Sequence, residues 1–259
     1  MSMRPHALVT ALALLLIATG VNTPAQATHS WGGYHWARTT ASFTLQLGDN
    51  VDSTWDDYLG VGSTDWTQST VLDTLVVPGT VRPKNCRATA GRVEVCNAAY
   101  GSNGWLGLAS ISITGGNHIS AGFVKVNDSY FKTAKYNTPA WRNLVMCQEI
   151  GHTLGLDHQD ENFINPNLGT CMDYTNDPST NQHPNTHDYA ELKSIYSHLD
   201  TTTTVAATAA SAGAGSAQEV GNTPDSWGRV IEGSRAEGHS TYVRSVGNGK
   251  FLITFVTWA

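Results

Sequence analysis

The sequence predicts an α/β fold, with a sheet built from the first half of the chain and helices from the second. Short β-rich runs end near Asn127, and two apolar stripes with a period of about 3.6 residues follow. The chain has 259 residues, which is enough for one sizeable core and a minor appendage. We therefore expect one main domain in which the strands precede the helices.

The predicted strands are short and end at turn residues. Residues 42–47 alternate apolar and polar side chains and stop at Gly48-Asp49-Asn50. Residues 54–77 are ambiguous, because their pattern suits either a helix or a loop that leads into a strand at 71–77. The other predicted strands cover residues 93–95, 105–113 and 119–126.

Two helices are predicted after the strands. Thr138 can cap free amides, and Pro139 suits the first helical turn because a missing N–H is harmless there. This helix should run to about Leu154 and end at Gly155. A second apolar stripe after Pro184 predicts the closing helix.

The first 27 residues are predicted to be a secretory signal peptide. Arg4 precedes the apolar run Ala7–Ile17, and small residues at Ala25 and Ala27 suit cleavage before Thr28. The run is about half the roughly 20 residues of a membrane span, so an uncleaved anchor is the weaker alternative. We expect a secreted, extracellular protein without membrane contact after cleavage.

The composition changes after Asp200, which separates a main domain at 28–200 from the rest. Residues 201–220 are mostly Thr, Ala, Ser, Gly and Val and are predicted to be a flexible linker. Residues 221–259 form a short tail, in which Asn248-Gly249 between alternating apolar runs indicates a β-hairpin. Such a tail either docks on the main domain or stays loosely ordered.

Charge and cysteine content exclude some classes of protein. With 15 Lys and Arg against 21 Asp and Glu, the chain lacks the basic face that nucleic acid or anionic lipid requires. Four cysteines in a secreted chain indicate two disulfides with three possible connectivities. We favour the local pairs Cys86–Cys96 and Cys147–Cys171, and the lack of Cys-x-x-Cys spacing argues against a thiolate metal site.

The chemistry is concentrated between Gln148 and His158. On a helix, residues 148 and 152 share a face, and Glu149 is displaced to one side. Gly155 lets the chain reverse, so His158 can return towards His152. Three ligands and an open fourth position are what a catalytic zinc ion requires.

The pattern Glu-x-x-His-x-x-Gly-x-x-His, with Met172 fourteen residues after His158, resembles the metzincin clan of zinc peptidases and, within it, the matrixins. The segment Gly104–Ala109 and the closing helix support the resemblance, which covers about residues 36–199. It implies a twisted, mostly parallel sheet with an active-site helix and a C-terminal helix. It also implies that Met172 forms the floor of the site in a Met-turn, that Tyr174 lies near the metal, and that strand Ile119–Val126 aligns an extended peptide by edge pairing.

One residue departs from the family pattern. Gln148 stands where the first zinc-binding histidine is expected, and a neutral amide oxygen is a weaker zinc ligand than imidazole. Either Gln148 coordinates through this oxygen, or another residue near the motif replaces it. The candidates for replacement are Asp157, Asp160, Tyr174, His183 and His187.

The expected function is that of a secreted, monomeric zinc endopeptidase that acts on peptides or proteins. His152, His158 and Gln148 would hold one catalytic zinc ion, and Glu149 would act as general base. Structural calcium is conceivable from the Asp and Asn loops, although the chain has no twelve-residue calcium loop. The alternative is an inactive, secreted binding or inhibitory module on a peptidase scaffold.

Overall fold

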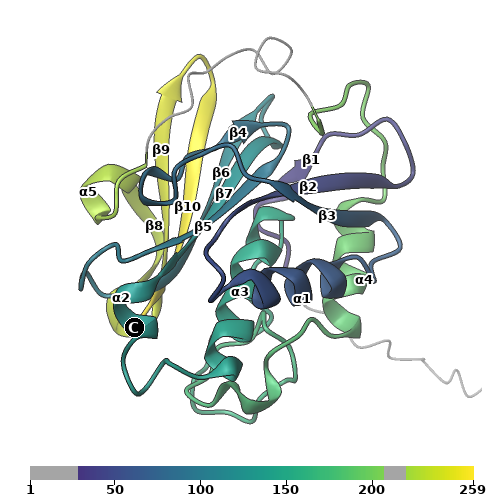
Figure 1. Ribbon diagram of the computed structural model, residues 1–259. Coiled ribbons are helices and arrows are strands. Elements are labelled where there is room, and N and C mark those ends of the chain that lie inside the picture. Colours follow the sequence, from purple (N-terminus) through teal and green to yellow (C-terminus); the bar gives the residue numbers. More distant parts are fainter. Residues whose placement is uncertain (1–28, 207–219) are drawn as a thin grey trace, which may run out of the picture.

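A computed structural model describes residues 29–206 and 220–259, in which helices cover a single mixed sheet (Figure 1). The predicted signal peptide and residues 207–219 of the predicted linker lie outside the described residues. The strands are β1 (His35–Trp36), β2 (Phe43–Asn50), β3 (Leu72–Pro78), β4 (Thr89–Ala90), β5 (Val93–Ala98), β6 (Trp105–Thr114), β7 (His118–Asn127), β8 (Arg229–Ser234), β9 (His239–Gly247) and β10 (Lys250–Trp258). The α-helices are α1 (Asp56–Trp66), α2 (Asp128–Phe131), α3 (Pro139–Thr153), α4 (Thr186–Ile195) and α5 (Pro224–Trp227).

The sheet has a parallel half and an antiparallel half. Its strand order is β3-β2-β5-β7-β6-β10-β9-β8, with β1 and β4 also pairing with β7. Strands β3, β2, β5 and β7 run parallel to one another, whereas β6, β10, β9 and β8 continue the sheet in antiparallel pairs. The expectation of a mostly parallel sheet is therefore wrong, because β6 and β7 form a hairpin and the tail adds β10, β9 and β8 as further antiparallel neighbours.

Strand β7 is an interior strand of this sheet. Gly122 is paired with Val93 of β5 on one side and with Ile111 of β6 on the other. Its backbone N–H and C=O groups are thus already used, so the prediction that Ile119–Val126 aligns a peptide by edge pairing is wrong. Without the tail, β6 would be the edge strand next to β7, but β10 pairs with it.

Each face of the sheet has its own apolar core. Successive side chains of a strand point to opposite faces, so Val124 packs with the helices and Phe123 packs on the other side. Helices α1, α3 and α4 lie together on one face, and α5 lies on the other (Figure 1). The described residues include no helix that is long and apolar enough to cross a membrane.

Local sequence signals determine the ends of α3. The Thr138 side chain accepts a hydrogen bond of 3.3 Å from the Trp141 amide, and Pro139 occupies the first turn. After the last turn, Gly155 has a φ of +100°, and a Cβ there would collide with the carbonyl oxygen of Tyr34. The predicted helix is therefore confirmed, and the ambiguous segment 54–77 contains α1 followed by β3.

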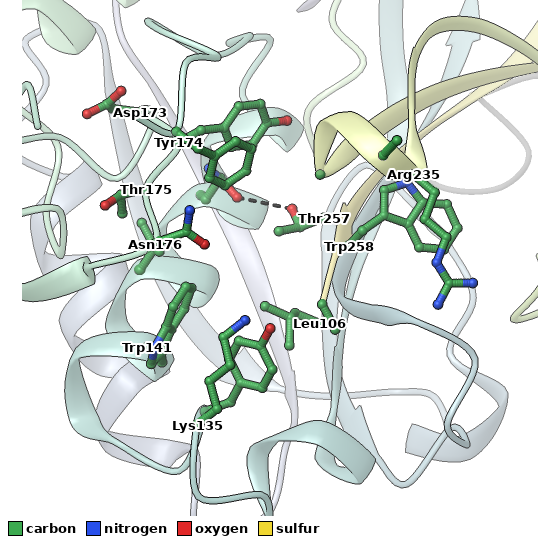
Figure 2. Close-up of a pocket in the computed structure, with 17 residues that line it drawn as sticks. Leu106, Lys135, Trp141, Asp173, Tyr174, Thr175, Asn176, Arg235, Thr257 and Trp258 are labelled. Atoms are coloured by element: carbon green, nitrogen blue, oxygen red, sulfur yellow. Dashed lines mark hydrogen bonds between the residues drawn. The ribbon is translucent and has the colours of Figure 1, made fainter. Parts of the chain in front are cut away.

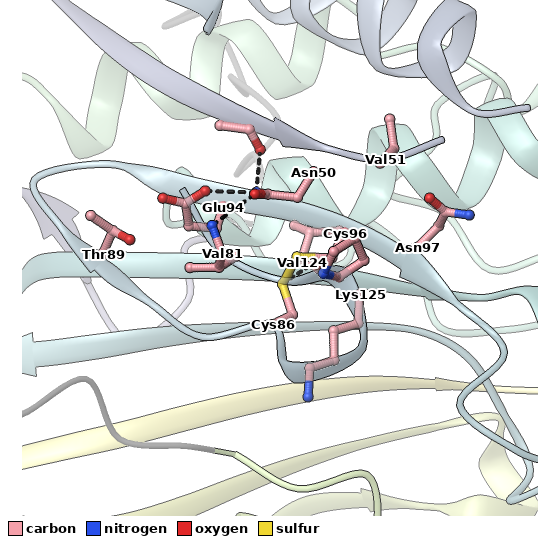
Figure 3. Close-up of a disulfide and its surroundings, with 12 residues drawn as sticks. Asn50, Val51, Val81, Cys86, Thr89, Glu94, Cys96, Asn97, Val124 and Lys125 are labelled. Carbon is pink, nitrogen blue, oxygen red and sulfur yellow. Dashed lines mark hydrogen bonds between the residues drawn. A yellow bond between two sulfur atoms is a disulfide. The ribbon is translucent and has the colours of Figure 1, made fainter. Parts of the chain in front are cut away.

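The Cys86–Cys96 disulfide joins the loop before β4 to strand β5 (Figure 3). Beside it, the Asn50 amide donates a 2.6 Å hydrogen bond to Glu94 Oε2, and Asn50 Oδ1 accepts one of 2.9 Å from the Val81 amide. Arg92 forms an ion pair with the buried Glu94 carboxylate at 3.0 Å. These contacts hold the loop against the parallel half of the sheet.

The C-terminal tail is part of the sheet. Asn248 and Gly249 both have positive φ values, +54° and +68°, as the predicted hairpin turn requires, and they connect β9 to β10. Upstream of the tail, the Thr204 amide donates a 2.9 Å hydrogen bond to the Ala37 carbonyl, so the start of the predicted linker lies against the main domain. The tail therefore docks on the main domain by adding the strands β10, β9 and β8 to its sheet.

We expect a chain that ends at residue 206 to lose cooperative unfolding. Removing the tail uncovers the edge of β6 and the apolar residues Trp105, Leu108 and Phe123, which are fully buried in the whole chain. Thermal unfolding followed by far-UV circular dichroism measures the effect. An unchanged melting curve would show that residues 28–200 fold independently of the tail.

Candidate active site

Helix α3 carries three of the predicted site residues in its last turns, and all three are buried. Gln148, Glu149 and His152 have exposed fractions of 1%, 0% and 0%. The helix packs on β6 and β7, and its end lies close to the loop that contains Met172. A Cβ on Gly151 would lie 2.6 Å from Met172 Sδ, so glycine lets the helix and this loop approach each other.

His152 presents an unprotonated nitrogen to the site. Its Nδ1 lies 2.9 Å from the Leu156 carbonyl oxygen, which can only accept, so Nδ1 carries the proton. Nε2 is buried and has no hydrogen-bond partner among residues 29–206 and 220–259. Burial, reinforced by the nearby His158, lowers the pKa of His152 well below its usual value. The imidazole is therefore neutral, with its Nε2 lone pair available to a metal ion.

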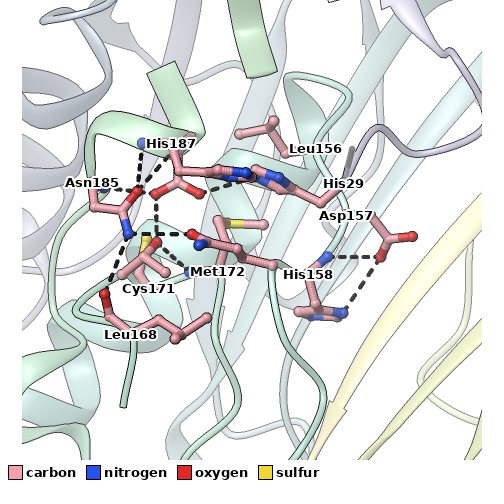
Figure 4. A network of polar contacts seen from close by, with 12 residues as sticks. His29, Leu156, Asp157, His158, Leu168, Cys171, Met172, Asn185 and His187 are labelled. Atoms are coloured by element: carbon pink, nitrogen blue, oxygen red, sulfur yellow. Dashed lines mark hydrogen bonds and ion pairs between the residues drawn. The ribbon is translucent and has the colours of Figure 1, made fainter. Parts of the chain in front are cut away.

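His158 returns to the same place from the segment after Gly155. The ring centroids of His152 and His158 are 4.6 Å apart. His158 Nδ1 forms ion pairs with Asp157 Oδ1 at 3.5 Å (Figure 4) and with Glu161 Oε1 at 3.6 Å, whereas Nε2 has no partner in the described part of the chain. Burial lowers the pKa of His158, but these two carboxylates outweigh it and raise the pKa above its usual value.

The Glu149 carboxyl is fully enclosed. Burial raises its pKa to about 8, although a hydrogen bond from Thr257 and the nearby His158 oppose this shift. Oε1 lies 2.8 Å from Thr257 Oγ1, while none of the described residues gives Oε2 a hydrogen-bond partner. A Cβ on Gly107 of β6 would lie 2.5 Å from Oε1, so a glycine in the strand makes room for the carboxyl.

Gln148 is held at both ends of its amide. Nε2 donates a 3.0 Å hydrogen bond to the Cys171 carbonyl oxygen, which fixes the orientation of the amide. Oε1 lies 3.0 Å from the hydroxyl of Thr257, so this one hydroxyl faces both Gln148 and Glu149. The amide oxygen of Gln148 therefore points towards the tail, beside the carboxyl of Glu149.

The residues of the predicted Met-turn lie next to the histidines. Met172 is fully buried, and the Tyr174 ring centroid is 4.0 Å from that of His158. The Tyr174 hydroxyl is buried without a hydrogen-bond partner, and burial raises the pKa of Tyr174 well above its usual value. The Cys147–Cys171 disulfide joins α3 to this loop, as in the local pairing that the sequence favoured.

The five candidates for replacing the first histidine lie in different places. Asp157 and Tyr174 contact His158, whereas Asp160 accepts hydrogen bonds from its own loop. His183 is exposed and lies 2.7 Å from Asp65.

His187 belongs to a separate cluster, where it stacks on His29 with a centroid distance of 4.8 Å (Figure 4). Asp188 in that cluster already accepts hydrogen bonds from His29, Thr170 and the Asn185 amide, so its carboxylate is occupied in capping α4.

Three residues of the tail complete the site, and no motif in the sequence indicated them. Phe255 of β10 stacks on His152 with a centroid distance of 3.9 Å and an interplanar angle of 2°. His239 of β9 stacks on Tyr174, and its Nε2 lies 3.3 Å from Glu161 Oε1. With Thr257, these side chains cover the carboxyl and the two imidazoles.

A cavity of about 320 Å³ opens beside this cover (Figure 2). Gln148 is the one residue of the α3 motif that reaches it, and Lys135 and Arg235 bring positive charge to its wall. The other labelled residues around it include Leu106, Trp141, Tyr174, Thr257 and Trp258. Solvent therefore approaches the site from the side of Gln148 and Thr257.

The donors present fit a divalent ion of the zinc type. Nε2 of His152 and Nε2 of His158 are buried without a partner among the described residues, which is unfavourable by about 1–3 kcal/mol for each group. Imidazole is a preferred zinc ligand, and Asp157, His158 and Glu161 also bring donor atoms within 4.8 Å of one another. The amide oxygen of Gln148 is available as a weaker third donor only if it exchanges its contact with Thr257.

Comparison with known proteins gives little beyond this geometry. No protein-family model matches the chain, and no curated protein matches it. Among solved structures, it is similar to high choriolytic enzyme 1, a hatching enzyme zinc-protease from the medaka fish Oryzias latipes. The TM-score is 0.34 and the identity 9%, over 63% of this chain and 94% of that one. Because this likeness is weak, the residues of the site carry the functional argument.

The two disulfides should differ in their effect on the site. Replacing Cys147 and Cys171 by serine should lower the free energy of unfolding by about 2–5 kcal/mol and also weaken zinc binding, because α3 is no longer fixed to the loop that contains Met172. The matched control is the Cys86→Ser, Cys96→Ser chain, which should lose stability only. Denaturant unfolding and zinc titration measure the two effects, and equal zinc affinity in both variants would contradict this assignment.

Proposed function

We propose that the protein is a zinc-dependent peptidase whose active site lies at the end of α3. The observation that carries the proposal is the buried, unprotonated and unpartnered Nε2 of His152, one helical turn from the buried carboxyl of Glu149. Uncompensated lone pairs of this kind are characteristic of functional sites. His158 supports the proposal because it brings a second imidazole to the same place from another segment.

His152 and His158 would hold the ion, with Gln148 Oε1 as the third and weakest donor. An ion bound there would polarise the carbonyl of a peptide and lower the pKa of a water molecule. Glu149 takes a proton from water and returns it to the leaving amine, as its position beside both ligands allows. A bound cation would lower the pKa of Glu149 from its raised value of about 8, so that the carboxylate could act as a base despite its burial.

A Glu149→Gln variant tests the proposed base. We expect it to lose at least about 100-fold in the rate of hydrolysis of an unfolded protein substrate, while zinc content is retained, because general base catalysis contributes about that much. Asp73→Asn, an exposed change on β3, is the matched control and should leave the rate unchanged. Equal hydrolysis by the Glu149→Gln chain would reject Glu149 as the base.

The second candidate function is an inactive binding module, and one observation favours it. Strand β10 occupies the free side of β6, and its residues Phe255 and Thr257 cover His152 and Glu149. A peptide therefore cannot add to β6 by strand pairing while β10 stays in place. A latent peptidase would cleave once this cover is loosened, whereas a binding module would never cleave.

Loosening the cover distinguishes these two functions. For a latent peptidase, Phe255→Leu should raise the hydrolysis rate several-fold, because it removes the ring that stacks on His152. Phe251→Leu, on the same strand but 37% exposed, is the matched control and should leave the rate unchanged. No hydrolysis by any of these chains, with zinc bound, would support the binding module instead.

A further inference from the structure

We infer that His35, His198 and Asp200 form a second metal-ion site, separate from the site on α3. The three residues come from distant segments: His35 from β1, and His198 and Asp200 from the segment that follows α4. The ligand class is imidazole and carboxylate, which suits Zn²⁺. This inference does not depend on the proposed peptidase function.

The three donor atoms form a nearly equilateral triangle. His35 Nε2 and His198 Nε2 are 3.2 Å apart, and they lie 3.5 Å and 3.7 Å from Asp200 Oδ1. Tetrahedral zinc with ligands at about 2.0–2.1 Å places neighbouring donor atoms about 3.3–3.4 Å apart. The observed triangle therefore has the dimensions of one face of such a tetrahedron.

Backbone groups orient two of the three ligands. His35 Nδ1 lies 2.9 Å from the Gly33 carbonyl oxygen and must donate to it, so the proton is on Nδ1 and Nε2 has a free lone pair. Asp200 Oδ2 accepts a 2.9 Å hydrogen bond from the Arg38 amide, which leaves Oδ1 facing the imidazoles. Outer hydrogen bonds of this kind commonly fix metal ligands in proteins.

His118 adds a third imidazole beside the same carboxylate oxygen. It begins β7, pairs with His35 across the strands, and has its Nε2 3.1 Å from Asp200 Oδ1. Three imidazoles thus converge on one oxygen atom, which is more than hydrogen bonding to a single carboxylate requires. We assign His118 as an outer partner that positions Asp200, because His35, His198 and Asp200 form the compact set.

The position of the site suggests a structural role. The Asp200 amide donates a 2.8 Å hydrogen bond to the Arg38 carbonyl, so the site lies where the end of the main domain meets the segment after β1. Next to His35, Trp36 Nε1 donates a 2.9 Å hydrogen bond to the Thr153 carbonyl at the end of α3. An ion here would hold the N-terminal strand in place. The His198 side chain is 51% exposed, so the ion can enter from solvent.

Zinc titration calorimetry tests the site in a chain that carries His152→Ala and His158→Ala, which removes the two histidines of the candidate active site. We expect this chain to bind one Zn²⁺. Adding His198→Ala should weaken binding by more than about 100-fold, and His118→Ala by about 10-fold, as for a ligand and an outer partner. Because His198 is exposed, its replacement should leave the fold intact, which circular dichroism checks.

His183→Ala is the matched control, since His183 is 55% exposed and also contacts a carboxylate, that of Asp65. It should leave zinc affinity unchanged. Asp200→Asn gives a second test of zinc affinity. The asparagine side chain can still accept the hydrogen bond from the Arg38 backbone N–H, but it lacks the negative charge, so zinc binding should weaken. Equal zinc affinity in the His198→Ala and His183→Ala chains would overturn the inference, as would the absence of zinc binding once His152 and His158 are replaced.

Discussion

The backbone pairing between β6 and β10 is the interaction on which the rest of the structure depends. It joins the parallel half of the sheet to the C-terminal strands and continues the apolar layer on both faces. It also brings Phe255 and Thr257 onto the end of α3. The same ladder that completes the core therefore determines the environment of the candidate active site.

This environment explains the unusual electrostatics of the α3 site. Glu149 and His152 are enclosed by apolar side chains, so both are driven towards their neutral forms. Their remaining lone pairs have no partner among the described residues. A cation at this place would relieve that cost, whereas a well-packed core would have used apolar residues.

The sequence predicted those features that depend on neighbours along the chain. The bounds of α3 follow from Thr138 and Gly155, and the approach of His152 to His158 follows from helical spacing and one reversal. The hairpin at Asn248 was equally readable. The pairing of this hairpin with β6 could not be predicted, because alternating apolar residues in β10 do not specify which strand edge they join.

The same limit applies to His35, His198 and Asp200, which come from segments far apart in the sequence and carry no motif. Only the pairing of β1 with β7 and the return of the chain after α4 bring them together. The wrong expectations about the sheet have the same origin. The parallel strands were correctly predicted to be strands, but the sequence did not indicate which strands pair with one another.

The separation of β6 and β10 along the chain also bears on how the protein folds. Ile113 pairs with Phe251, so the ladder closes a loop that contains α2, α3, α4 and α5. Contacts between residues so distant in sequence raise the contact order and slow folding, because the entropy of closing the loop is lost before the strands gain their hydrogen bonds. During synthesis, α3 and the segment after it leave the ribosome well before β10, and His152 and His158 are therefore open to solvent ions until the last strand is added.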